Sequence, residues 1–204
     1  MFDWMTANSD ALTLVANLGM VGVWLIYLNV FLVGFTRQNR TVLHISRAAA
    51  DDRRGRCLIT NMGAQNVYLL AVIVDLETED GHSRALVTDR EEFSKEDFDD
   101  LLQRTLQGPL GSGEARDIGS FEDLARRAQM RRGTNFDLSR ICAMKITVVA
   151  APNQVRELCG AYKQFDVREV DNPDAARFVP RSLLSPQITG PFRTRRLAAM
   201  IDDR

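Results

Sequence analysis

The sequence has few of the residues that build disulfide frameworks and metal centres, with three cysteines and two histidines among 204 residues. Cys57, Cys142 and Cys159 form no CxxC pair, and their odd number is typical of reduced thiols in a cytosolic domain. His44 and His82 are too few for a three-histidine metal site within one chain. We therefore expect no metal and no other cofactor.

Sequence motifs of common enzyme classes are also absent. The chain contains no GxxxxGK[ST] phosphate loop, no GxSxG nucleophile elbow and no HExxH zinc motif. The glycine-rich segment 108–113 does not open directly into a predicted helix, as a phosphate-binding loop must. The acidic segment 89–100 lacks the glycine of a calcium-binding loop. These absences predict a protein that is not an enzyme.

Neither sign of charge is in excess. The 26 basic and 27 acidic residues give a formal net charge of −1, so the composition gives no reason to expect nucleic acid as a partner. Hydrophobic residues make up 45% and charged residues 26% of the chain, values typical of globular proteins. This composition excludes a chain that is disordered throughout, a collagen and a small disulfide-rich scaffold.

What the chain does have is one long uncharged run, from Ala11 to Phe35. A helix rises about 1.5 Å per residue, so this run exceeds the ~30 Å hydrocarbon core of a bilayer. A cleaved signal peptide has an apolar region of about 7–15 residues with basic residues before it, whereas acidic residues precede this run. We expect a single retained transmembrane helix at 11–35, after a short extracytoplasmic N-terminus at 1–10.

The charges beside this helix predict its orientation. No lysine or arginine precedes it, and arginines follow it from Arg37 and Arg40 onwards. Because basic residues near a span stay on the cytoplasmic side, we expect the N-terminus outside and residues 36–204 in the cytoplasm, with the helix in the inner (plasma) membrane. Trp4 is expected at the outer lipid interface, and Arg37 and Arg40 beside lipid headgroups.

Several residues of the helix favour packing against another helix. Asn17 and Asn29 are polar where polarity is costly, and Gly19 and Gly22 permit close approach, although their spacing is not GxxxG. Trp24 shares one helical stripe with Asn17. One interpretation is contact with a partner helix or with a second copy of the chain. The other is that both asparagines lie near the helix ends, where headgroups or water satisfy them.

The rest of the chain has the pattern of a β-rich cytoplasmic domain. Residues 36–55 are expected to form a basic membrane-proximal linker and a first strand at 41–46, before the main domain at 56–170. A strand at 67–78 is apolar on both faces for half its length, so we expect both faces to be covered. The other strands, predicted from alternating residues and turn signals, are 56–61, 82–88, 141–151 and 160–170.

Between the strands the hydrophobic period changes to that of helices. One helix is predicted at about 94–106. A second is predicted from Ser120 to Gly133, where Ser120 followed by Asp123 marks a helix start. This inserted helical pair, within about 90–132, is expected to cover the second face of the long strand.

The segment ITNMGAQNVYLLAVIV, residues 59–74, contains an Asn-x-Gly turn between two core strands. It resembles the strand–turn–strand of immunoglobulin-like sandwiches. This resemblance and the short antiparallel strands imply a mainly β fold, namely an immunoglobulin-like antiparallel β-sandwich that carries the inserted helical pair. The resemblance indicates a fold class and no particular family.

Two charge clusters flank the predicted helices. Acidic residues near a helix N-terminus and basic residues near a C-terminus suit the helix dipole. The same residues are candidates for contacts between copies of the chain or with another protein. The acidic cluster includes Glu92, Asp99 and Asp100, and the basic cluster consists of Arg126, Arg127, Arg131 and Arg132.

The C-terminal residues 171–204 are interrupted by prolines and predict a less regular tail with a short helix at 193–201. Arg195 and Arg196 make this helix basic at its start, against the preference of the helix dipole, so its stability in isolation should be low. Such a segment fits docking on a neighbouring subunit. An ordinary flexible tail is the other interpretation.

These observations predict a single-pass membrane-anchored, non-catalytic protein that acts as a scaffold or accessory subunit of a membrane complex. Its partners would be the lipid bilayer and either further copies of the chain or other membrane protein subunits. Two alternatives stay open. One is a membrane-tethered ligand-sensing or enzymatic domain with a pocket between the sheet and the inserted helices, and the other is an oligomeric pore or transport subunit.

Overall fold

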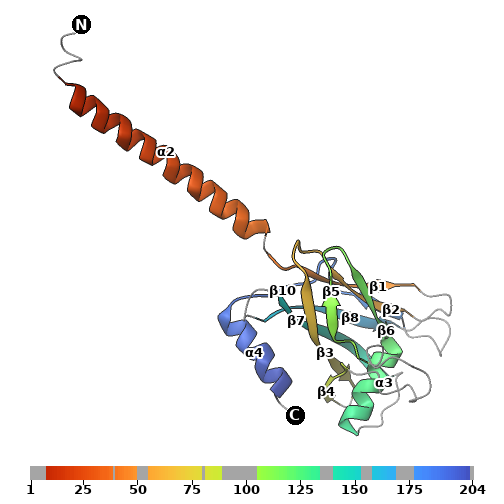
Figure 1. Cartoon of the computed structure of the whole chain (residues 1–204). Helices are drawn as coiled ribbons and strands as arrows, with labels where there is room; N and C mark the ends of the chain where they lie inside the picture. The colour runs from red at the N-terminus through yellow and green to blue at the C-terminus, as the bar shows by residue number, and fades with distance from the viewer. Residues whose placement is uncertain are drawn as a thin grey trace. The chain divides into compact units, whose positions relative to one another are not determined.

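The computed structural model divides the chain into two compact units, residues 1–40 and 41–204 (Figure 1). Among the described residues, the first unit consists of one long helix and the second is mainly β. The residues that the structure describes are 8–38, 40–49, 55–79, 81–88, 105–133, 140–152, 158–168 and 177–202.

Helix α2 runs from Ser9 to Gln38 and has 30 residues. Its segment Ser9–Phe35 reaches a mean hydropathy of 2.1, and none of this apolar window is buried. At about 1.5 Å per residue, the segment is longer than the hydrocarbon core of a bilayer. By length and composition α2 can therefore cross a membrane, and it fits either an anchor or a signal sequence.

Two antiparallel sheets and two helices form the second unit. The smaller sheet has the strand order β1-β2-β6; the larger has the order β10-β8-β7-β3-β4, and β5 pairs with β3 and β9 with β8. The predicted strands agree with the observed bounds to within one or two residues. The elements are β1 Leu43–Ala48, β2 Arg56–Asn61, β3 Val67–Thr78, β4 Gly81–Leu86, β5 Gly108–Leu110, β6 Ala115–Ser120, α3 Phe121–Arg132, β7 Ile141–Pro152, β8 Cys159–Arg168, β9 Arg177–Pro180, β10 Gln187–Ile188 and α4 Pro191–Asp202.

The two sheets share one hydrophobic core. Ile45 of β1, Ile59 of β2 and Ile146 of β7 are all fully buried members of this cluster. Phe121, the first residue of α3, contacts Phe165 of β8 edge-on, with the two ring centroids 4.7 Å apart. Burial of such side chains provides the main driving force for folding.

A bulge in β3 exchanges its two faces. The pairing of β3 with β7 shifts between Leu69 and Ala71, which makes Leu70 the extra residue. Leu69 before the bulge and Val72 after it therefore face the same core, although strict alternation would put them on opposite faces. Ile73 faces a second hydrophobic cluster, with Ala71. The strict alternation expected along β3 is wrong across this bulge, whereas the expectation that both faces are covered is confirmed.

Helix α4 covers the second face of the larger sheet. Leu197 is buried in the second cluster with Ile73 and Val149. Gly160 of β8 permits this approach, because a Cβ atom there would lie 3.0 Å from Leu197 Cδ1 and 2.6 Å from the Val148 carbonyl oxygen. Of the two predicted inserted helices, α3 packs on the other hydrophobic cluster and does not cover this face. The predicted C-terminal helix supplies the cover instead.

Helix α3 packs on the core between the sheets, and Figure 1 shows it away from α4. Its buried residues include Phe121 and Leu124. A capping box at Ser120 begins the helix and Gly133, with a φ of 61°, ends it, which confirms the second predicted helix. The helix predicted at 94–106 lies almost entirely outside the described residues, so an inserted pair is not clearly shown.

Candidate functional site

The segment 181–188, here called the C-terminal strap, follows β9, includes β10 and closes one edge of the small sheet. The Gln187 side chain accepts a hydrogen bond from the Leu43 amide at 3.0 Å and donates one to the Leu43 carbonyl at 2.7 Å. β1 is an edge strand of the small sheet. The Gln187 amide therefore satisfies the main-chain groups that a neighbouring strand would otherwise bind.

Ser185 continues this edge two residues along β1. Its hydroxyl oxygen accepts from the Ile45 amide at 2.9 Å and lies 3.3 Å from His44 Nδ1. On its other side the strap pairs with β8, since the Tyr162 amide donates to the Pro186 carbonyl at 3.1 Å. The strap thus joins strands that belong to different sheets.

A lysine lies under the strap, in the row of β8 side chains that faces the core. Lys163 is 4% exposed, between the fully buried Ala161 and Phe165. Its Nζ atom donates to the Leu183 carbonyl at 3.0 Å. Burial lowers the pKa of Lys163, because it removes the charged amine from water. The alternation along this strand predicts its inward direction, and the strap provides its polar partner.

Two more titratable groups share this environment. Burial, followed by the nearby Lys163 charge, lowers the pKa of His44. The Cys57 thiol is fully buried, and burial followed by the Asp117 charge raises its pKa, so it stays protonated at neutral pH. The hydrogen bonds of Lys163 and Ser185 go mainly to backbone groups of the strap and β1. Chemically, this site fastens the two sheets together.

A second polar cluster lies on the face that α4 covers. Asp75 is 4% exposed and forms ion pairs with Arg84 and, at 3.8 Å, with Lys145 Nζ, and it lies 3.6 Å from His82 Nε2. The cross-strand register places Arg84 of β4 and Lys145 of β7 on either side of Asp75. Lys145 also lies over the Tyr162 ring, 5.0 Å from its centroid. The cluster ties β4 to the centre of the larger sheet.

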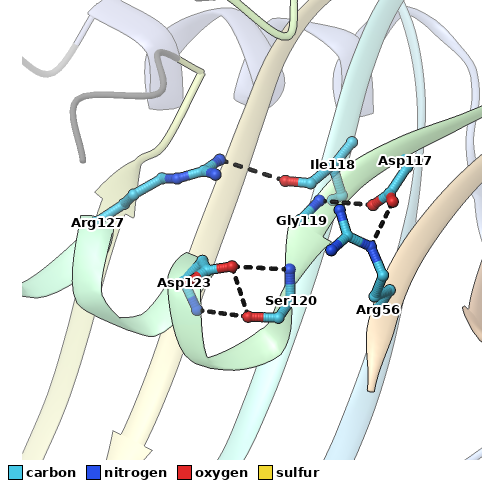
Figure 2. A network of polar contacts seen from close by, with 7 residues as sticks. All are labelled: Arg56, Asp117, Ile118, Gly119, Ser120, Asp123 and Arg127. Atoms are coloured by element: carbon cyan, nitrogen blue, oxygen red, sulfur yellow. Dashed lines mark hydrogen bonds and ion pairs between the residues drawn. The ribbon is translucent and has the colours of Figure 1, made fainter. Parts of the chain in front are cut away.

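Figure 2 shows how Arg127, one residue of the basic cluster of α3, contacts β6. The pairing of β2 with β6 shifts between Cys57 and Leu58, which leaves Ile118 as the extra residue of a bulge. The Arg127 guanidinium donates to the Ile118 carbonyl at 3.3 Å and is 3% exposed as a residue. Arg127, like the other residues of the basic cluster, was a candidate for contacts with another protein. It is instead buried and supports the bulge in β6.

The remaining bonds in Figure 2 fix the start of α3. Asp117 pairs with Arg56 and accepts from the Gly119 amide at 2.8 Å. Ser120 Oγ accepts from the Asp123 amide at 3.1 Å, and the Asp123 carboxylate accepts from the Ser120 amide at 3.2 Å. Gly119 has a φ of 113°, a conformation that L side chains rarely adopt.

The residues predicted for packing within the membrane all lie on α2. Four are exposed and Gly22 is half-buried, and no atom outside the helix's own backbone would lie within 4 Å of a Cβ at Gly19 or Gly22. One side of α2 carries a shallow apolar hollow. The exposed residues are Asn17, Gly19, Trp24 and Asn29, and the hollow is lined by Met20, Val21, Trp24, Leu25, Tyr27, Leu28 and Phe31.

Other predicted contact residues are partly outside the described part of the chain. Arg40, Arg126, Arg131 and Arg195 are exposed, and Arg132 is exposed with its Nε donating to the Arg84 carbonyl at 2.6 Å. The structure describes the backbone of Arg37 and Arg196 but not their side chains. Residues outside the described part altogether are Trp4, Glu92, Asp99 and Asp100.

The sequence pattern predicts the positions of some of these polar side chains but not of others. A period of two along β8 predicts that Lys163 faces the core, whereas the face of Asp75 follows the bulge in β3 and the strap depends on side chains far apart in sequence. Within the described residues, no group of three or more His, Cys, Asp or Glu side chains could hold a metal ion. In comparisons with protein-family models, curated proteins and solved structures, nothing matches this chain.

Proposed function

We propose that this protein is a single-pass, membrane-anchored and non-catalytic scaffold or accessory subunit of a membrane protein complex. The observation that carries the proposal is the unburied apolar surface of α2, which runs over Ser9–Phe35. Exposure of so much contiguous apolar surface to water is unfavourable, so the helix needs lipid or other helices around it.

The flanking charges support an orientation with the N-terminus outside and the β-rich unit in the cytoplasm. No basic residue precedes α2, whereas Arg37 and Arg40 follow its apolar segment. The membrane is then the inner, or plasma, membrane. Arg40 is exposed, as a residue that contacts anionic headgroups must be.

Helix packing within the bilayer is the proposed means of association, with further copies of the chain or other membrane subunits. The apolar hollow on α2 includes Met20, Trp24, Leu28 and Phe31, which recur at helical spacing along one side. Asn17 lies one turn before Met20 and is exposed for a hydrogen bond across helices.

For the second unit we propose an immunoglobulin-like sandwich that acts as the interaction domain. In support, the turn at Asn61–Gly63 joins β2 of the smaller sheet to β3 of the larger one. Basic side chains that a ligand pocket would need are engaged in contacts within the protein. These contacts favour a scaffold over a ligand-sensing or enzymatic domain. Lys145 pairs with Asp75, and Arg116 donates to the Leu106 and Pro109 carbonyls.

Cys142 offers a direct test of the orientation. This residue is exposed, because a register shift of β7 makes it the extra residue of a bulge, whereas Cys57 and Cys159 are buried. A membrane-impermeant maleimide should label Cys142 only after the inner membrane is permeabilised. In a Cys142→Ser background, Ser9→Cys should be labelled in intact cells. Labelling of Cys142 in intact cells would contradict the orientation.

Association through α2 is tested with paired variants. The variant Trp24→Ala/Leu28→Ala removes two residues of the hollow, and Ile26→Ala/Val30→Ala removes two exposed residues at the same spacing outside it. Cross-linking in mild detergent should show at least a fivefold loss of oligomer or partner complex for the first variant and little change for the second. A wild-type particle that is monomeric and free of partners would contradict the proposal.

A further inference from the structure

Few large apolar side chains are exposed on the described part of the β-rich unit, and most of them gather near its first strand. Met130, at 59%, lies in the last turn of α3. The others are Met62 at 61%, Tyr68 at 43%, Leu183 at 88% and Leu184 at 71%. Two adjacent leucines with such exposure are unusual unless they meet lipid or another protein.

Hydrogen bonds place Met62 and the two leucines on either side of β1. The Met62 amide donates to the Val42 carbonyl at 2.8 Å, directly before β1. On the opposite edge of β1, the strap that carries Leu183 and Leu184 is held at Leu43 and at Ile45. Met62 therefore lies beside the residue that precedes β1, and Leu183 and Leu184 come directly before the strap residue that is bonded to Ile45.

The covalent chain keeps this edge close to the end of α2. Only four residues, 39–42, lie between Gln38 and Leu43, so the Cα atoms of Gln38 and Leu43 are at most about 18 Å apart when the chain is fully extended. The headgroup region adds roughly 5–8 Å on each side of the hydrocarbon core. The linker therefore allows the start of β1 to reach the lipid surface, and Leu184 precedes the strap residue that is bonded two positions further along β1, at Ile45.

We propose that Met62, Leu183 and Leu184 form a second membrane contact, inserting at the headgroup–acyl boundary of the bilayer that holds α2. This inference rests on the proposed anchoring by α2. Arg40, which is exposed and precedes β1 in the chain, adds a positive charge that favours anionic headgroups. Apolar side chains on both edges of one strand suit a fluid surface better than a single shaped pocket on a partner.

The strap is suited to present the leucines. The Lys163 amine donates a hydrogen bond to the Leu183 carbonyl from the core side. Further along the strap, the side chains of Ser185 and Gln187 form hydrogen bonds with the backbone of β1. The Leu183 and Leu184 side chains are left outside the core, so their insertion requires no opening of the sandwich. Contact with lipid then fixes the orientation of the β-rich unit on the membrane.

The test uses the full chain in vesicles of phosphatidylcholine and phosphatidylglycerol. In a Cys142→Ser background, Leu184→Cys and, separately, Met130→Cys are labelled with an environment-sensitive fluorophore, since Cys57 and Cys159 are buried. Met130 is the matched control, an exposed apolar residue of α3. Lipids with a nitroxide near the headgroup should quench the label at position 184 at least threefold more than the label at position 130.

Three results would overturn the inference in distinguishable ways. Equal quenching at both positions, in protein that resists alkaline carbonate extraction, rejects the second contact but leaves α2 as an anchor. Release by carbonate rejects the anchor itself. A blue shift that grows with the protein-to-lipid ratio, without lipid quenching, assigns the leucines to contact between copies.

The double variant Leu183→Ser/Leu184→Ser gives an independent measurement. Its melting temperature should equal that of the wild type, because both side chains lie outside the core. In vesicles, amide hydrogen exchange of the strap should become at least threefold faster than in wild type, and in detergent the two proteins should agree. Equal exchange in vesicles would reject the contact.

Discussion

The Nζ atom of Lys163 donates a hydrogen bond to the carbonyl oxygen of Leu183, 3.0 Å away. Lys163 belongs to β8 and Leu183 to the strap, so this bond fastens the strap from the core side of β8. Ser185 and Gln187 fasten it from the side of β1. Together these contacts close the small sheet at its β1 edge.

Replacement of Ser185 by alanine should weaken this closure. The variant Ser185→Ala leaves the Ile45 amide without its acceptor in a buried position, which costs about 1–3 kcal/mol. Ser182→Ala is the control, because the Ser182 hydroxyl makes an exposed bond to the Leu184 carbonyl and its loss should cost less than about 0.5 kcal/mol. Urea unfolding of the full chain in mild detergent, followed by circular dichroism, measures both. Equal effects would contradict the role of Ser185.

His44 predicts the direction of the pH dependence of stability. Burial lowers its pKa in the folded chain below the ordinary value of 6.5. Below pH 6.5 the unfolded chain therefore binds more protons than the folded chain, so stability falls as pH falls through this range. Lys163 has the same sign, because its folded pKa lies below 10.5 and stability rises with pH up to that value.

The variant His44→Gln tests this dependence. The slope of unfolding free energy between pH 5 and 7 should decrease, by at most about 1.4 kcal/mol per pH unit for one proton. His82→Gln replaces an exposed histidine and serves as the control. Denaturation at pH 5, 6 and 7 provides the slopes. If His44→Gln keeps the wild-type slope, His44 does not titrate differently on folding.

Arg127 and Arg126 are neighbours in sequence with different predicted effects. Arg127→Met removes the donor to the Ile118 carbonyl at the β6 bulge and should destabilise the protein by about 1–3 kcal/mol. Arg126→Met changes an exposed side chain and should stay within about 0.5 kcal/mol of wild type. Thermal denaturation compares the two. A larger loss for Arg126 would contradict the buried role of Arg127.

Local patterns in the sequence were sufficient to predict many of the elements. Alternating residues and turn signals predicted most strands, and Ser120 with Gly133 predicted the ends of α3. Which side chains of β3 share a face of the sheet could not be predicted, because the bulge at Leu70 depends on pairing with β7. A bulge changes which side chains share a face without changing the residue pattern.

The candidate sites were harder to predict for the same reason. Gln187 and Leu43 are 144 positions apart, and the bonds between them join a side chain to the backbone. No local period marks such a contact. The cover of the second sheet face by Leu197 likewise depends on where α4 docks, which the amphipathic pattern of a single helix does not reveal.

The bonds between Gln187 and Leu43 also set an order of events during biosynthesis. β1 leaves the ribosome soon after α2, but its partner in the strap follows 144 positions later. At about 5–20 residues per second, this delay is on the order of 10 s. Throughout that time β1 has an open edge that can pair with other nascent chains. Synthesis of the strap therefore controls when the open edge of the small sheet is protected from aggregation.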